Sequence, residues 1–245
     1  MVALTVFTIE VALTLTLITW LRVASRGEPP PWSFIIRLLL YGGICAVVAA
    51  FVELRYTFTL RELQSLFPAA SPQVNHALFG LNYFAVALIE ETGKYFVAIL
   101  TIVNTRHLHR ISDAIIYLVI IGLGFSLIED AFYLLNPTID APYRLLSFYL
   151  HSGTSAIIGY CLGKYSFGLG SYRQVAEGLL AAIALHLSYN LVTTLSDRHA
   201  AFELTVLITL FITIQIFTLF RQALIEEYCL ERSNHPPKRQ RLLNI

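Results

Sequence analysis

Long apolar segments separated by short polar ones run along almost the whole chain. A helix needs about 20 apolar residues to cross the roughly 30 Å hydrocarbon core of a bilayer. The sequence therefore predicts an all-α fold, a polytopic membrane helix bundle of about seven transmembrane helices. The predicted helices are residues 2–21, 34–54, 77–103, 113–135, 145–166, 175–196 and 201–225.

The joints between these segments are rich in residues that end helices. Examples are "RGEPPPW", "FPAASPQ" and "NPTIDAPYR", whose Pro, Gly, Asn and Asp residues favour turns. We expect one membrane-embedded bundle over residues 1–226 and a polar cytoplasmic tail over residues 227–245. No basic segment precedes the first apolar run, so we interpret that run as a retained anchor and not as a signal peptide.

Basic residues gather on one side of the predicted bundle. The loops after the first, third and fifth helices and the C-terminal flank hold most of the Lys and Arg residues. The opposite loops hold only Arg55, Arg61, Arg144 and Arg198. By the positive-inside rule, we expect the N-terminus outside the cell and the C-terminus in the cytoplasm.

The composition agrees with a membrane protein. Hydrophobic residues make up 56% of the chain and charged residues 13%, and the mean hydropathy is +0.66, which is far to the apolar side of a soluble domain. The net charge is only +1, and no basic-aromatic motif is present, so a nucleic-acid partner is excluded. The lipid bilayer is the expected surrounding.

Polar and ionisable residues interrupt four consecutive predicted helices, although an uncompensated charge at membrane depth costs several kcal/mol. Residues four positions apart share a helix face, so such groups can point together into the bundle. The residues are Glu90, Glu91 and Lys94 in the third helix, Glu129 and Asp130 in the fourth, His151 in the fifth, and His186 and Asn190 in the sixth.

The depth of these groups tests whether they can share one site. At about 1.5 Å per residue, Glu129, His151 and Asn190 fall roughly 7 to 10 Å below the outer boundary, with His186 one turn deeper. If the third helix starts at Ala77, Glu90 lies deeper than the others. We expect Glu90 to be level with them only if that helix starts several residues later, or has a broken or tilted start.

Each polar group also has a purely structural interpretation. Lys94 could neutralise a neighbouring glutamate, a lone His151 could form an interhelical hydrogen bond, and the His186–Asn190 pair could tie two helices together. These interpretations weaken when the groups are considered together, because most of them are compatible with one depth on four adjacent helices.

Hydrolysis of a peptide bond would use such a set. The reaction needs a water, a base, donors for the tetrahedral oxyanion and an acid for the leaving amine. A glutamate pair at low dielectric can serve as a base near neutral pH, with Lys94 as electrostatic support. His151 could share the water, while His186 and Asn190 could supply oxyanion donors from one helix face.

The same residues could instead hold a metal ion, because histidine and glutamate are acceptable zinc ligands. A metal-dependent site would use Glu90, His151 and His186. The chain has no H-E-x-x-H motif, and its imidazoles come from different helices. Zinc therefore remains a secondary possibility, and we expect no cofactor.

Four motifs, taken in order, resemble those of the PrsW-type intramembrane proteases, which are grouped with type II CAAX prenyl endopeptidases and bacteriocin-immunity-type membrane proteins. The motifs are "EETGK", "DAIIYLVIIGLGFSLIED", "RLLSFYLHSGTSAIIG" and "HLSYN". The resemblance covers about residues 80–195, the expected catalytic core. One departure is Asp130, which stands where the family usually has asparagine.

The resemblance implies a glutamic-type intramembrane endopeptidase acting on a membrane-anchored protein or peptide. It implies Glu90 as the base, Glu91 as its partner and His151 as a second contact to the water. It also implies that His186 and Asn190 form the oxyanion site and that Glu129 orients an imidazole or the water.

Two other functions fit buried ionisable groups. A proton-coupled transporter uses such residues as a relay, and a non-catalytic membrane protein could bind a partner helix through them. The feature that favours the protease is the His186–Asn190 pair, because an oxyanion site needs an amide beside an imidazole and a relay does not.

Overall fold

Seven helices form the described part of the chain. The computed structural model describes residues 2–24, 29–65, 72–103, 105–135, 141–194 and 197–232. The helices are α1 (Val2–Ala24), α2 (Trp32–Ser65), α3 (Pro72–Thr101), α4 (Ile111–Leu135), α5 (Ala141–Ser166), α6 (Tyr172–Thr193) and α7 (Arg198–Arg232). The predicted all-α bundle is confirmed.

Six of these helices are long and apolar enough to cross a membrane, judged by length and composition. The exception within the described residues is α3, which carries Glu90, Glu91 and Lys94. The charged residues that lower the hydropathy of α3 are thus the ones that it brings into the interior of the bundle.

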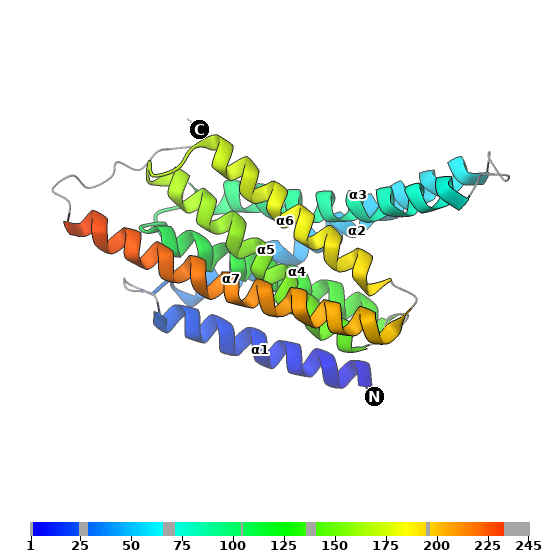
Figure 1. Cartoon of the computed structure of the whole chain (residues 1–245). Coiled ribbons are helices and arrows are strands. Elements are labelled where there is room, and N and C mark those ends of the chain that lie inside the picture. The colour runs from blue at the N-terminus through cyan, green and yellow to red at the C-terminus, as the bar shows by residue number, and fades with distance from the viewer. Residues whose placement is uncertain are drawn as a thin grey trace.

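Helix α4 lies at the centre of the bundle. Its residues from Ile111 to Ser126 are all buried, and it contacts α1, α2, α3, α5 and α7. Figure 1 shows α4 and α5 in the middle, with α1 and α7 along one side and the α2–α3 pair on the other. A helix that is apolar all round is stable only when neighbours cover it on every side, which explains the central position.

Two glycines of the packed interior let neighbouring helices approach α4 closely. A Cβ at Gly159 of α5 would lie 2.8 Å from the Ala114 carbonyl oxygen of α4, and a Cβ at Gly124 of α4 would collide with the Leu39 carbonyl of α2. The absence of a side chain therefore sets the distance of α5 and α2 from α4. This spacing brings the polar residues of the three helices within contact of one another.

The start of α3 differs from the sequence expectation. The helix begins at Pro72, earlier than the predicted residue 77, so the later start that was one of the two expected ways to a shared depth is wrong. Figure 1 shows the reason: the end of α2 and the start of α3 project together beyond the ends of the other helices. The extra turns lie outside the bundle, and Glu90 meets the other polar groups inside it.

Two other helices are longer than predicted. Helix α2 continues to Ser65 and α7 to Arg232, because the charged stretches after their apolar segments contain neither Pro nor Gly and are compatible with a helix. The first residues of the expected polar tail are therefore helical. Residues 233–245 of that tail lie outside the described residues.

The first turn of α4 is held by two carboxylates. Asp113 accepts hydrogen bonds from the backbone N–H groups of His109 and Arg110, at 2.8 and 2.9 Å. Glu227 of α7 accepts one from the Ser112 N–H at 2.7 Å. These bonds satisfy N–H groups that a helix start leaves without intrahelical partners, and they attach α7 to the central helix.

The close approach of α4 and α5 can be tested by adding a methyl group. We expect Gly159→Ala to destabilise the protein by about 1–3 kcal/mol, because the new Cβ has backbone atoms in its way. The measurement is thermal unfolding in detergent. Gly80→Ala in α3 is the matched control, since its Cβ would meet nothing within 4 Å. Equal melting temperatures for the two variants would contradict the packing argument.

Candidate active site

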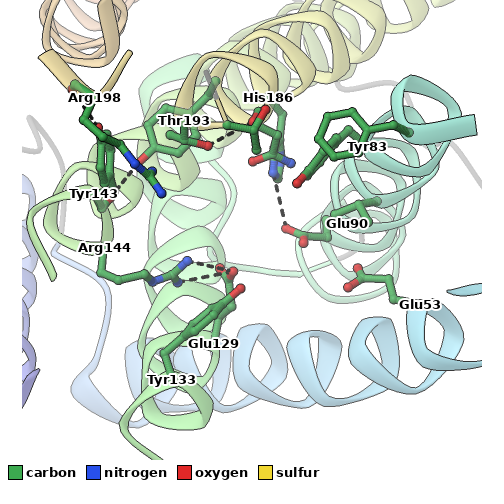
Figure 2. A pocket seen from close by; sticks show the side chains of 15 residues that line it. Glu53, Tyr83, Glu90, Glu129, Tyr133, Tyr143, Arg144, His186, Thr193 and Arg198 are labelled. Atoms are coloured by element: carbon green, nitrogen blue, oxygen red, sulfur yellow. Dashed lines mark hydrogen bonds and ion pairs between the residues drawn. The ribbon is translucent and has the colours of Figure 1, made fainter. Parts of the chain in front are cut away.

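A cavity of about 570 Å³ opens among six of the seven helices. Figure 2 shows that acidic, basic and aromatic side chains from separate helices point into it. The lining includes Glu53 of α2, Tyr83 and Glu90 of α3, Glu129 and Tyr133 of α4, Tyr143 and Arg144 of α5, His186, Tyr189 and Asn190 of α6, and Arg198 of α7.

A buried ion pair lies behind the wall of this cavity. The Lys94 ammonium donates to Glu91 Oε1 at 2.7 Å, and both side chains are 0% exposed. Lys94 Nζ also lies 2.9 Å from His151 Nδ1, and Glu91 Oε1 lies 2.7 Å from His186 Nδ1. One lysine–glutamate pair from α3 thus holds an imidazole of α5 and an imidazole of α6.

The contacts of His151 define its tautomer. An ammonium group has only donors, so His151 Nδ1 must accept the hydrogen bond from Lys94. The proton then sits on Nε2, which donates to Glu129 Oε2 at 2.8 Å. Glu129 Oε1 in turn accepts from Arg144 at 3.2 Å. Both ring nitrogens of His151 are therefore occupied.

Only one ring nitrogen of His186 forms a hydrogen bond with the described residues. Its Nδ1 donates to the Glu91 carboxylate, which can only accept. Its Nε2 lies 3.8 Å from Glu90 Oε2, and His151 Nδ1 lies 3.9 Å from the same oxygen. Among the described residues, Glu90 Oε2 has no hydrogen-bond partner. The two neighbouring glutamates therefore differ: Glu91 is held in a network and Glu90 is not.

The structure brings most of the predicted site residues into one place. Six of them are in direct contact or within 4 Å of another member, namely Glu90, Glu91, Lys94, Glu129, His151 and His186. Asn190 lines the same cavity as His186. Asp130 lies on the far side of Arg144, with which it pairs, and so supports the site only through that residue.

The sequence analysis missed Glu53 of α2. Its carboxyl group is within hydrogen-bonding reach of Glu90, and both residues line the cavity in Figure 2. Glu53 falls near the predicted end of the second helix, where a charge normally marks the membrane boundary. The sequence after Glu53 contains neither Pro nor Gly up to Ser65. This feature could have identified Glu53 as a residue inside a longer helix.

Glu10 of α1 belongs to the same set of contacts. Ser126 of α4 donates to Glu10 Oε1 at 2.6 Å, and the Glu10 carboxyl group lies near that of Asp130. Asp130 pairs with Arg144. Polar residues therefore continue from α1 through α4 and α5 to the cavity.

A metal ion fits this arrangement only partly. Glu90, His151 and His186 each offer one ligand atom, and these atoms lie within 4.8 Å of one another. However, the Nδ1 lone pair of His151 accepts a hydrogen bond from Lys94, while its Nε2 is bonded to Glu129. As arranged, the three side chains do not fit a zinc ion, because His151 has no free lone pair unless Lys94 moves.

The fold and the cavity together define a polytopic membrane protein with a buried acid–imidazole site. The profile of the "PrsW family intramembrane metalloprotease" matches residues 30–219, and the chain belongs to this family. It is 25% identical over 193 residues to Protease PrsW of Oceanobacillus iheyensis, covering 77% of this chain and 83% of that protein.

Two further relatives carry the same name. Protease PrsW of Geobacillus kaustophilus is 25% identical over 77% of this chain and 79% of its own length, and that of Bacillus subtilis is 21% identical over 74% and 78%. No solved structure matches the chain. Family membership assigns the chain to the integral, multi-pass membrane peptidases, whose substrate is a protein in the membrane.

Because Lys94 donates a hydrogen bond to His151 Nδ1, this nitrogen is not free to bind zinc in the wild type. We expect metal-depleted wild-type protein, dialysed against micromolar zinc, to retain no zinc at this site. Lys94→Met removes the competing donor and keeps the length of the side chain, so we expect one zinc ion per chain to appear. Elemental analysis of the purified protein measures the content.

The double variant Lys94→Met/His186→Ala is the control for binding elsewhere, because it removes one ligand of the new site. Stoichiometric zinc in the wild type that disappears with His186→Ala alone would contradict this prediction and would favour a metal centre.

Proposed function

We propose that the chain is an intramembrane endopeptidase in which Glu90 activates the water that attacks the peptide bond. The observation that carries the proposal is the position of Glu90 Oε2, which faces the cavity without a hydrogen-bond partner among the described residues and within 4 Å of two imidazoles. Glu91 is a poor choice for the base, since its carboxylate is engaged by Lys94 and His186.

The proposed reaction begins when Glu90 takes a proton from a water molecule. The water oxygen bonds to the carbonyl carbon, and the electron pair of the carbonyl double bond moves to its oxygen. Asn190 and His186 would donate hydrogen bonds to that oxyanion. His186 needs a proton on Nε2 for this role, and the Glu91 carboxylate 2.7 Å from its Nδ1 stabilises the resulting cation.

The tetrahedral intermediate then collapses. The proton on Glu90 passes to the leaving nitrogen, the C–N bond breaks, and the products are a carboxylic acid and an amine. The expected contact between His151 and the water is not part of this proposal, because Lys94 and Glu129 occupy both of its ring nitrogens. His151 would instead link Lys94 to Glu129 beside Glu90. Arg144 and Asp130 would hold Glu129 in place.

Glu53 adds a carboxyl group to this proposal. Two carboxyl groups in hydrogen-bonding contact away from bulk water share one proton, because two adjacent negative charges repel strongly. The shared proton would hold the two carboxyl groups together and leave one negative charge on the pair, which can take the proton from the water. This role makes Glu53 a positioning residue for the base.

A zinc-dependent protease is the second candidate. The specific observation in its favour is the convergence of Glu90, His151 and His186 within 4.8 Å, together with the metalloprotease description of the family. These three residues would hold the ion, which would polarise the water. This arrangement requires Lys94 to leave His151, and we therefore favour the glutamate mechanism.

The principal test is cleavage of quenched transmembrane peptides by purified protein in detergent. We expect Glu90→Ala and His186→Ala each to lower kcat/KM by about 10²–10⁴-fold, the usual contribution of a catalytic acid–base group. Glu177→Gln on the exposed face of α6 is the control, with an expected change of less than about twofold.

Four outcomes of this test would count against the proposal. Cleavage that survives both alanine variants would refute the catalytic assignment. Loss of cleavage with a chelator and its recovery with zinc would favour the metalloprotease. Ion flux in proteoliposomes that is abolished by Glu90→Gln, in the absence of any peptide cleavage, would favour a proton-coupled transporter. If the protein shows neither cleavage nor ion flux, a non-catalytic partner-binding protein would be favoured.

The role of Glu53 can be tested separately. Glu53→Gln keeps a hydrogen-bond donor beside Glu90, so we expect a kcat loss of about tenfold or less, whereas Glu53→Ala should lower kcat by about 10²-fold with little change in KM. Steady-state kinetics on one peptide measures both. Equal losses for the two variants would contradict the positioning role, because a merely structural side chain gains nothing from the retained donor.

A further inference from the structure

Two arginines line the cavity, and their environments differ. Arg144 pairs with Glu129 and Asp130, and its guanidinium lies 3.9 Å from the centre of the Tyr133 ring. Its side chain is only 12% exposed. Two carboxylates of the protein thus already compensate its charge.

Arg198 is the opposite case. It is exposed at the first position of α7, and Figure 2 shows its side chain extending toward the cavity beside Tyr143 and Thr193. Within the described part of the chain, no hydrogen bond or ion pair of its guanidinium is found. Its charge at the cavity mouth is therefore available to a bound molecule.

The backbone around Arg198 is firmly held. Its carbonyl oxygen accepts from the Tyr143 hydroxyl at 3.4 Å. Asp197 Oδ1 accepts from the backbone N–H groups of His199 and Ala200 at 3.0 and 3.2 Å, which fixes the start of α7. The fold thus determines the place of the guanidinium group while leaving its donors unused.

The charge of the cavity changes between its inner wall and its mouth. Glu53, Glu90 and Glu129 lie on the inner wall, where they would repel a carboxylate of a substrate. At the mouth, the Thr193 and Thr194 hydroxyls already donate to backbone carbonyls of α6. Arg198 remains the group there that can bind a carboxylate, and its planar fork of N–H donors matches one.

We propose that Arg198 binds a carboxylate of the substrate at the mouth of the cavity, so that the protease prefers a segment with an acidic group a few residues from the bond that is cut. The carboxylate is that of an internal Asp or Glu side chain or that of a free C-terminus. This inference rests on the proposed peptidase function, because it assigns the same cavity its substrate class.

The test uses one quenched transmembrane peptide that the wild type cleaves. Versions carry Glu, Gln or Lys at each of the four positions on either side of the cut, with the C-terminus either amidated or free. We expect kcat/KM to be about tenfold higher with Glu than with Gln at one position, the effect of one charge-assisted pair. A preference seen only with the free C-terminus would assign the carboxylate to the chain end.

Variants of Arg198 separate recognition from catalysis. Arg198→Gln should lower cleavage of the Glu peptide to that of the Gln peptide while leaving the Gln peptide within about twofold. Arg198→Glu should reverse the preference toward the Lys peptide. Arg55→Glu, an exposed arginine of α2 outside the cavity lining, makes the same charge change and should leave the preference as in the wild type.

A binding measurement keeps this inference independent of turnover. The dissociation constants of fluorescent Glu and Gln peptides are compared between Glu90→Gln and Glu90→Gln/Arg198→Gln, neither of which needs to cleave. Absence of cleavage by the wild type would refute the proposed function. Carboxylate recognition would still be supported if the double variant binds the Glu peptide tenfold more weakly than Glu90→Gln does and binds the Gln peptide equally well. The proposal would be overturned if the ratio of the dissociation constants of the Glu and Gln peptides is the same in both variants. It would also be overturned if the Arg198 substitution weakens the binding of both peptides equally.

Discussion

Lys94 is a cation with no exposed surface, and the polar interior of the protein depends on how its charge is compensated. An unpaired ammonium in an apolar bundle would be strongly unfavourable, so Lys94 contacts Glu91 on its own helix and His151 on α5. Glu91 extends the network to His186 on α6. Three helices are thereby held in one relative arrangement, and breaking any contact leaves a buried charge without its partner.

This network also explains why two adjacent glutamates behave differently. One turn of helix separates Glu91 from Lys94, and their pairing points Glu91 away from the cavity. Glu90 is rotated by one residue and lies in the cavity wall beside Glu53. A glutamate that is held in a network thus lies beside a buried glutamate that lines the cavity, and the proposed activation of water by Glu90 uses this difference. The same lysine competes with any metal ion for His151.

The remaining contacts connect the site to the rest of the fold. Close packing of α5 on α4 at Gly159 brings Glu129 and His151 together. Arg144 bridges Glu129 and Asp130. Glu10 of α1, a helix along the side of the bundle, contacts Ser126 of α4 and lies near Asp130. Glutamates line the inner wall of the cavity and Arg198 lies at its mouth, and under the proposed recognition of a carboxylate this arrangement would orient a bound peptide.

The sequence by itself determined the helices and the set of polar residues, because apolar length and buried charge are local properties of the chain. It predicted that Glu90, His151 and His186 lie in one site, and the structure brings one ligand atom of each within 4.8 Å of the others. It did not reveal Glu53, or that Arg198 has no partner among the described residues, since both lie near predicted membrane boundaries, where a charge needs no explanation. Only the tertiary structure decided these points, because the length of the projecting α2–α3 pair and the partner of each charge depend on how distant helices pack.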